Sequence, residues 1–111
     1  MSSGEVLKQM LDKYGNNEEI KKDIAAMEKT FQFTPTDGEP YFVKVSQGEV
    51  SFHSGLDEKP TATISGKEET LLSLFNGTID PVMSYMTGKI KISGDLMSAT
   101  KITGIVKKLR K

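Results

Sequence analysis

Apolar residues recur every three to four positions near the start of the chain, which predicts two amphipathic helices. The apolar positions of the first helix are Val6, Leu7, Met10, Leu11 and Tyr14. Gly15 is expected to end this helix, because glycine readily adopts the left-handed conformation of a C-terminal cap. The second helix is expected to begin at Asn17, whose side chain can cap it, and to bury Ile20, Ile24 and Met27.

From Thr30 the period of the apolar residues changes to two, which predicts strands. Four short strands are expected at 31–33, 41–45, 50–52 and 62–64, joined by turns such as Asp37-Gly38 and Gln47-Gly48. Consecutive strands with short connections favour an antiparallel meander. One face of this sheet is apolar, so helices are expected to cover it.

Ser65 and Glu68 match the spacing of a capping box, which predicts a helix that ends at Asn76-Gly77. Asp80-Pro81 predicts the start of the next helix, with Asp80 as its N-terminal cap. This helix is apolar around most of its circumference: Val82, Met83, Tyr85 and Met86. It is therefore expected to be either wholly buried or turned with one face toward a cavity. Met83, Met86 and Met97 fit either arrangement, because methionine adapts to varied apolar shapes.

The last 24 residues are predicted to form a short strand and a basic helix. Ile90 and Ile92 alternate with polar residues, and Asp95 is expected to cap a final helix. Residues 88–111 hold seven Lys or Arg and one acidic residue, although the whole chain has no net charge. The basic end of the helix comprises Lys107, Lys108, Arg110 and Lys111. These cations either stabilise the helix C-terminus or contact an anionic membrane surface.

Composition excludes several classes of function. At 111 residues the chain is expected to form a single domain over residues 1–111. The lack of a basic excess argues against nucleic-acid binding. There is no cysteine, His53 is the only histidine, and no arrangement for a metal, a cofactor or nucleophilic catalysis is evident. No apolar leader is visible at the N-terminus, so a cytoplasmic, non-enzymatic protein is expected.

Four features stand out together: residues 60–66, the predicted helix at 71–75 with Asn76-Gly77 after it, the Asp80-Pro81 pair, and above all the run from Thr87 to Asp95, TGKIKISGD. In combination they resemble the sterol carrier protein type two family. The resemblance extends over essentially the whole chain. It implies an α+β fold, in which about five helices cover a five-stranded, mostly antiparallel sheet. It also implies an apolar tunnel between the sheet and the helices, and a fifth strand that does not extend the meander in simple order.

By position, the resemblance implies ten candidate tunnel residues: Phe75, Val82, Met83, Met86, Thr87, Leu96, Met97, Ile102, Ile105 and Val106. The implied ligand is a fatty acid, a fatty acyl-CoA, a sterol-like lipid or an isoprenoid, which the protein transfers or presents without chemistry. The alternative is an accessory protein that presents a lipid intermediate, such as a quinone precursor, to partner enzymes. The ending Leu109-Arg110-Lys111 differs from a peroxisomal signal, so the chain looks like a prokaryotic member, and we expect a monomer or weak dimer.

Overall fold

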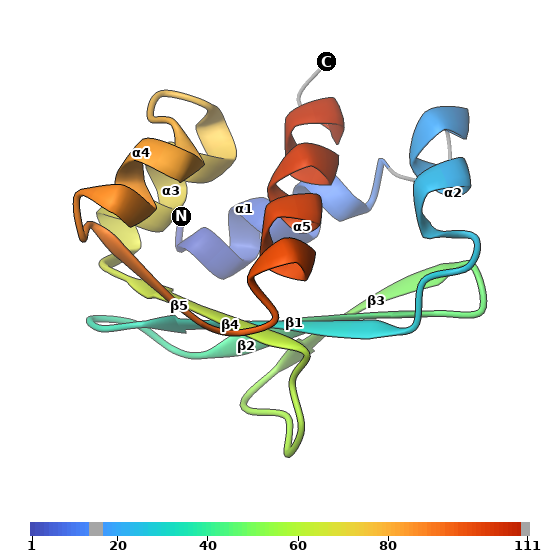
Figure 1. The fold of residues 1–111 in the computed structure, drawn as a ribbon, viewed down its shortest axis with the longest axis horizontal. Helices are drawn as coiled ribbons and strands as arrows, with labels where there is room; N and C mark the ends of the chain where they lie inside the picture. Colours follow the sequence, from blue (N-terminus) through green and yellow to red (C-terminus); the bar gives the residue numbers. More distant parts are fainter. Residues whose placement is uncertain (14–16, 110–111) are drawn as a thin grey trace.

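The computed structural model describes residues 1–13 and 17–109 and arranges them in two layers, a mixed sheet and a layer of helices (Figure 1). Five helices and five strands occur within these described residues. In chain order they are α1 (Ser3–Leu11), α2 (Glu18–Ile24), β1 (Lys29–Pro35), β2 (Tyr41–Ser46), β3 (Glu49–Ser54), β4 (Ala62–Gly66), α3 (Glu68–Asn76), α4 (Pro81–Met86), β5 (Ile90–Gly94) and α5 (Leu96–Leu109). The predicted α+β class is therefore confirmed, whereas Tyr14 and the predicted cap Gly15 lie outside the described residues.

The strand order in the sheet is β3-β2-β1-β4-β5. The antiparallel meander predicted for the first four strands is correct for β1, β2 and β3, but the fourth strand does not extend it. β4 instead lies parallel to β1, with Phe33 opposite Ile64, and β5 then pairs antiparallel with β4. The departure from simple order thus occurs at the fourth strand, whereas the resemblance placed it at the fifth. Three of the four strand pairings are antiparallel, as expected.

The crossover from β3 to β4 runs beneath the face of the sheet that carries no helices (Figure 1). Gln32 lies in β1, and its side-chain oxygen accepts a hydrogen bond of 2.7 Å from the Asp57 backbone N–H in this crossover. The Thr61 backbone N–H then donates to the Thr30 carbonyl at 2.8 Å. These long-range contacts bring β4 to the free edge of β1, and hydrophobic periodicity does not encode them.

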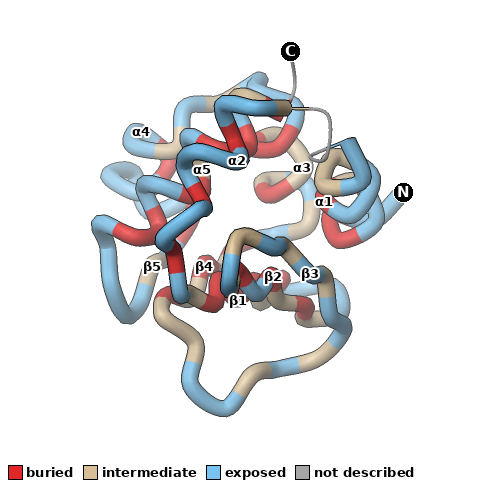
Figure 2. Tube along the Cα trace, turned by 90° about the vertical axis from the view of Figure 1, so that its right-hand side faces the viewer, coloured by how far each residue is buried: buried red, intermediate tan, exposed pale blue. Residues whose placement is uncertain are grey.

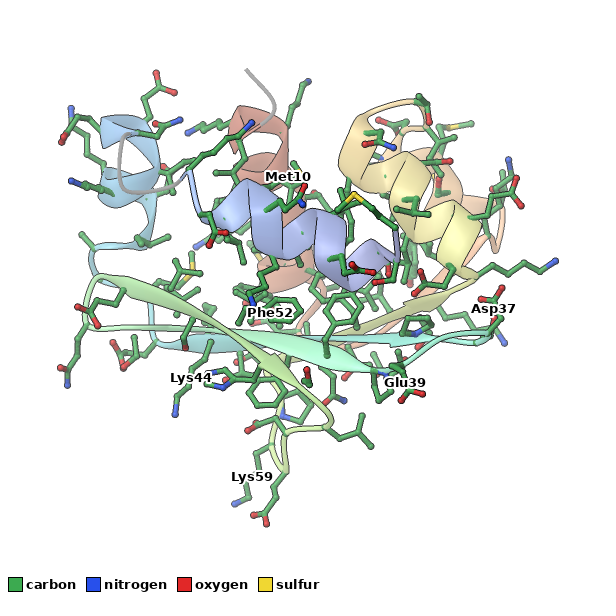
Figure 3. The ribbon with its side chains drawn as sticks, turned by 180° about the vertical axis from the view of Figure 1, so that it is seen from behind. Met10, Asp37, Glu39, Lys44, Phe52 and Lys59 are labelled. Carbon is green, nitrogen blue, oxygen red and sulfur yellow. The ribbon has the colours of Figure 1, made fainter. Side chains whose placement is uncertain are left out.

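The hydrophobic core lies between the helices and the upper face of the sheet (Figure 2). Phe33 stacks on Tyr41 with 5.2 Å between ring centroids and meets Phe75 of α3 edge to face at 5.6 Å. In Figure 3, Phe52 of β3 lies on the helix side of the sheet, whereas Lys44 of β2 points to the opposite side. The alternation of apolar and polar residues along these strands therefore sorts them between the core and solvent, as predicted.

Three of the predicted helix starts are confirmed by side-chain caps. Asn17 Oδ1 accepts from the Ile20 N–H, and Asp80 Oδ2 accepts from the Met83 N–H at 2.8 Å. Asp95 caps α5 in the same way, accepting from the amides of Met97 and Ser98. These caps depend on residues three positions apart or fewer, so the sequence alone specifies them.

The capping box predicted at Ser65 and Glu68 is wrong, because Ser65 belongs to β4 and Lys67 precedes α3 without a side-chain cap. Asp37, from the turn after β1, accepts from the Glu68 N–H at 2.8 Å instead. The Glu68 carboxylate reaches α1, where it accepts from the Ser3 N–H and the Ser3 hydroxyl, both at 2.7 Å. Partners from distant parts of the chain thus displace the local capping pair.

Candidate functional site

A cavity of about 370 Å³ lies between the helices and the β4–β5 end of the sheet. Figure 1 shows α4 and α5 on either side of this region, with β5 beneath them. Most of the lining is apolar and comes from the strands, α3, α4 and α5. The lining residues are Phe33, Ile64, Leu74, Phe75, Gly77, Thr78, Ile79, Asp80, Pro81, Val82, Tyr85, Ile90, Ile92, Leu96, Ala99, Thr100, Ile102, Thr103, Val106 and Lys107.

The chain leaves this space open because α3 and α4 are short and joined by a tight turn. Gly77 ends α3 in the left-handed conformation, with φ of 79°. The Thr78 N–H donates to the Ser73 carbonyl at 3.0 Å, which completes the helix end. Pro81 then starts α4, whose only buried residue is Ser84. The helix is thus held at the edge of the core and does not fill the space above β5.

Five of the ten predicted tunnel residues line the cavity: Phe75, Val82, Leu96, Ile102 and Val106. The other five, Met83, Met86, Thr87, Met97 and Ile105, are not part of the lining. Ile105 is buried, but it lies about 100° around α5 from Val106. The Thr87 hydroxyl donates to the Met83 carbonyl at 2.8 Å and so belongs to the end of α4.

The helix α4 is largely exposed, so the prediction that it is buried or turned with one face toward a cavity is only partly right. Val82 lines the cavity but is 56% exposed, whereas Met83 and Met86 are 57% and 72% exposed and face away from it. Met97, at the start of α5, is 76% exposed. With Leu96 these residues form an exposed apolar surface that we call the α4 patch: Val82, Met83, Met86, Leu96 and Met97.

Sequence reasoning missed lining residues on the strands and on α5. Ile64, Ile90 and Ile92 were assigned to the sheet face, but pattern alone does not show which part of that face is left uncovered. Lys107, predicted as a membrane contact, lies in the cavity lining. Its position one turn after Thr103 on the same side of α5 was the signal that could have indicated this.

The basic end of α5 is divided between two directions. Lys108 points to α2, where its Nζ lies 2.6 Å from Asp23 Oδ2, and this hydrogen bond raises the pKa of the Lys108 ammonium group. Lys107, the next residue back along the helix, faces the cavity and has no ion-pair partner among residues 1–13 and 17–109. Arg110 and Lys111 lie outside the described residues.

Polar groups are few in the cavity lining, and most already have partners. The hydroxyls of Thr100 and Thr103 donate to carbonyl oxygens of α5, at 3.1 and 2.7 Å respectively. Asp80 is the only carboxylate that residues 1–13 and 17–109 contribute to the lining, and it caps α4 through the Met83 N–H. Among the described residues of the lining, the ammonium group of Lys107 is the only cation.

The described residues contain no group of three or more side chains suited to hold a metal ion. His53 is exposed on β3, stacks on Phe42, and lies 2.8 Å from the Ser51 hydroxyl. Phe42 and His53 project from the face of the sheet opposite the helices, so His53 does not reach the cavity. No helix within the described part of the chain is long and apolar enough to span a bilayer.

The sequence model of the SCP-2 sterol transfer family matches residues 7–107. Sterol carrier protein 2 of Arabidopsis thaliana is 33% identical over 63 residues, which cover 57% of this chain and 51% of that protein. The curated relatives that this chain matches are longer proteins, since the matches span 11% to 51% of their length.

Solved structures show the same fold. The apo form of sterol carrier protein 2 from Yarrowia lipolytica superposes with a TM-score of 0.74 at 18% identity, over 97% of this chain and 89% of that chain. Palmitated SCP2L2 from Aedes aegypti gives a TM-score of 0.71 at 22% identity, over 96% of this chain and 95% of that chain.

Proposed function

The chain belongs to the SCP-2 sterol transfer family, and on this premise we propose that it binds an amphiphilic lipid in the cavity between α4, α5 and β5. The family supports lipid binding in general. The observation that carries the proposal for this chain is the apolar cavity itself, at about 370 Å³ and bordered by the exposed side chains of Val82 and Leu96. Ligand pockets in proteins typically have about 300–1,000 Å³ and a mostly apolar lining with few polar groups.

Burial of an acyl chain provides enough free energy for such a complex. Each buried methylene contributes about 0.8 kcal/mol, so ten buried carbons give roughly 8 kcal/mol before the costs of association and ordering. Since each methylene contributes little, the cavity should discriminate poorly between chain lengths. This supports a carrier for fatty acids, fatty acyl-CoA, sterol-like lipids or isoprenoids rather than a receptor for one molecule.

The carrier is proposed to act without chemical conversion of its ligand. His53 lies on the face of the sheet away from the cavity, so it is not placed to act as a base on a bound lipid. Asp80, the one acidic residue in the described part of the lining, is engaged as a helix cap. The single-domain organisation, the cytoplasmic location and the monomeric or weakly dimeric state stay predictions.

Ligand exchange is proposed to occur at an anionic membrane, through the α4 patch and the basic end of α5. Val82 and Leu96 belong to both the α4 patch and the cavity lining, so a membrane that contacts the patch lies next to the cavity. Residues 88–111 carry a large basic excess, which anionic lipids attract. Vesicle binding should weaken in the double variant Met83→Ser/Met86→Ser, because the apolar contact with the membrane is lost. It should also weaken in the triple variant Lys107→Glu/Lys108→Glu/Arg110→Glu, because the attraction to anionic lipids is lost.

The second candidate function is presentation of a lipid intermediate, such as a quinone precursor, to a partner enzyme. The exposed α4 patch favours this candidate as well, because exposed apolar side chains beside a cavity also suit contact with another protein. Affinity capture of the protein from its host, with a Met83→Ser/Met86→Ser variant as control, separates the two. An enzyme retained by the wild type but not by the variant favours presentation.

Native mass spectrometry of the purified protein, with extraction of bound lipid, tests the main proposal. We expect a lipid adduct that disappears on delipidation, and saturable displacement of a fluorescent fatty acid by unlabelled acyl chains. No adduct and no saturable binding of acyl chains, acyl-CoA and sterols would refute lipid carriage.

A further inference from the structure

The side of α5 that faces the cavity is apolar deep in the core and polar toward the surface. Ala99 and Val106 are 0% and 4% exposed, whereas Thr100 and Lys107 are exposed residues of the same lining. Thr103 lies between them, half-buried. Because residues 100, 103 and 107 are spaced at three and four positions, they form one stripe along the helix. The cavity therefore has an apolar interior and a polar margin along α5.

We propose that Lys107 binds the anionic head group of the ligand, so that the cavity selects amphiphiles that carry a carboxylate or phosphate at one end. This inference deepens the proposed function and depends on it. The acyl chain would lie against Ala99, Val106 and the strand residues, with the head group at the polar margin. A charge-assisted hydrogen bond from the ammonium group would then fix which end of the ligand remains near solvent.

Lys107 is the group in the lining that is suited to this role. The hydroxyl protons of Thr100 and Thr103 are already donated to helix carbonyls, so these side chains can offer only acceptor oxygens. An ionised carboxylate is itself an acceptor and needs a donor. Tyr85 of α4 also lines the cavity and can add a hydroxyl donor. Asp80 opposes an anion, but its carboxylate accepts from the Met83 N–H, which offsets part of its charge.

The other cations of α5 do not compete for this site. Lys108 is held by Asp23 on the α2 side of the helix. Lys101 is six residues before Lys107, about 120° away around the helix, and is not in the cavity lining. Lys101 is also exposed, so it offers a matched control with the same charge on the same helix.

The test compares the affinities of hexadecanoic acid and hexadecan-1-ol, which share a chain and differ in charge. Each compound is titrated as a competitor of a bound fluorescent fatty acid, at mildly alkaline pH and low salt. The titration is repeated for the delipidated wild-type, Lys107→Gln, Lys107→Arg and Lys101→Gln proteins. We expect the wild type to prefer the acid by about tenfold, as a single charge-assisted contact can provide. The preference should fall toward one in Lys107→Gln and persist in Lys107→Arg and Lys101→Gln.

The outcomes separate this inference from the function on which it rests. If the wild type binds neither compound, lipid carriage fails and the head-group site fails with it. If it binds both equally, or if Lys107→Gln keeps the preference for the acid, the cavity binds lipid but Lys107 does not select its charge. Tighter binding of hexadecyl phosphate than of hexadecanoic acid, again lost in Lys107→Gln, supports the same site with phosphate as its anion.

Discussion

Lys108 of α5 and Asp23 of α2 form an ion pair across the helix layer, with 2.6 Å between Nζ and Oδ2. The two residues are 85 positions apart in the sequence. Their contact marks the side of α5 that faces α2. Because Lys108 faces α2, the preceding Lys107 is directed about 100° away and lies in the cavity lining.

This ion pair should contribute a small, salt-dependent stabilisation. Both side chains are 37% exposed, so solvent screens their attraction. We expect Lys108→Ala and Asp23→Ala each to lower the melting temperature slightly, with a coupling in the double-mutant cycle that shrinks at high salt. Since the folded protein raises the pKa of Lys108, the contribution is present below the usual lysine pKa and is lost as pH rises through the raised value. Coupling that is independent of salt would contradict this account.

Gly94 should tolerate substitution poorly. It has φ of +85°, and a Cβ atom there would lie 2.5 Å from the Thr61 carbonyl oxygen. Gly94→Ala should therefore destabilise the protein by about 1–3 kcal/mol or more, since strain and a backbone clash act together. Gly104, inside α5, has open space around it, so Gly104→Ala should stabilise by about 0.5–1 kcal/mol. Urea denaturation measures the free energy of unfolding of both variants. A stabilised Gly94→Ala protein or a destabilised Gly104→Ala protein would contradict this backbone geometry.

Glu68 should anchor the first helix to the third. Its carboxylate accepts from the N–H and hydroxyl of Ser3, which is 0% exposed, and Tyr41 donates to the same hydroxyl at 2.8 Å. Glu68→Ala leaves the N–H and the hydroxyl of Ser3 without the Glu68 acceptor, at a cost of about 1–3 kcal/mol. Hydrogen exchange of the α1 amides should be faster in Glu68→Ala than in the wild type. Glu69 is the exposed neighbouring residue, and Glu69→Ala should leave the α1 amides protected. Equal exchange in both variants would exclude the anchor.

Asp95 should make part of the stability dependent on pH. Hydrogen bonds from the Ser98 side chain and backbone hold the pKa of the Asp95 carboxyl below its usual value. A group with a lowered pKa in the folded state stabilises above its unfolded pKa, and this contribution is lost as pH falls through the folded value. We expect the urea midpoint of Asp95→Ser, which keeps a neutral cap, to decline less steeply on acidification. Parallel declines in the two proteins would rule out this contribution.

Ala99→Leu should reduce lipid binding without unfolding the protein. Ala99 is fully buried in the cavity lining, so the larger side chain enters space that the ligand is proposed to occupy. We expect displacement titrations to show a loss of affinity of about tenfold or more, at a cost in stability of roughly 1–3 kcal/mol if the site cannot expand. Ala26→Leu, at an exposed position after α2, is the control. Unchanged affinity in Ala99→Leu would place the lipid elsewhere.

Local signals in the sequence predicted most of the helix and strand positions. Asn17, Asp80 and Asp95 each cap the helix that follows within three residues, and strand alternation placed Phe33 and Tyr41 on the buried face. These features depend on backbone geometry over a few residues, so no distant contact is needed to specify them. The family resemblance added the two-layer α+β arrangement.

The failures of prediction share a physical cause. The Ser65–Glu68 pair matches a capping box, but Asp37 and Ser3 compete for the same groups from distant parts of the chain. Met83 and Met86 are apolar residues of the kind that usually occupy a protein core. Both are nevertheless exposed, since Ser84 is the only residue of α4 that is buried. In both cases a tertiary partner, or the lack of one, overrides a local pattern.

The sequence by itself determined the type and position of most elements and the caps of α2, α4 and α5, because hydrophobic period and capping act over one or two turns. Only the tertiary structure decided that β4 lies parallel to β1, that α4 exposes its methionines, and that Lys107 and Lys108 face different neighbours. Those outcomes depend on which surfaces remain uncovered once the layers have packed. The cavity arises in the same way, since it is bounded by residues from Phe33 to Lys107 that meet only in the folded chain.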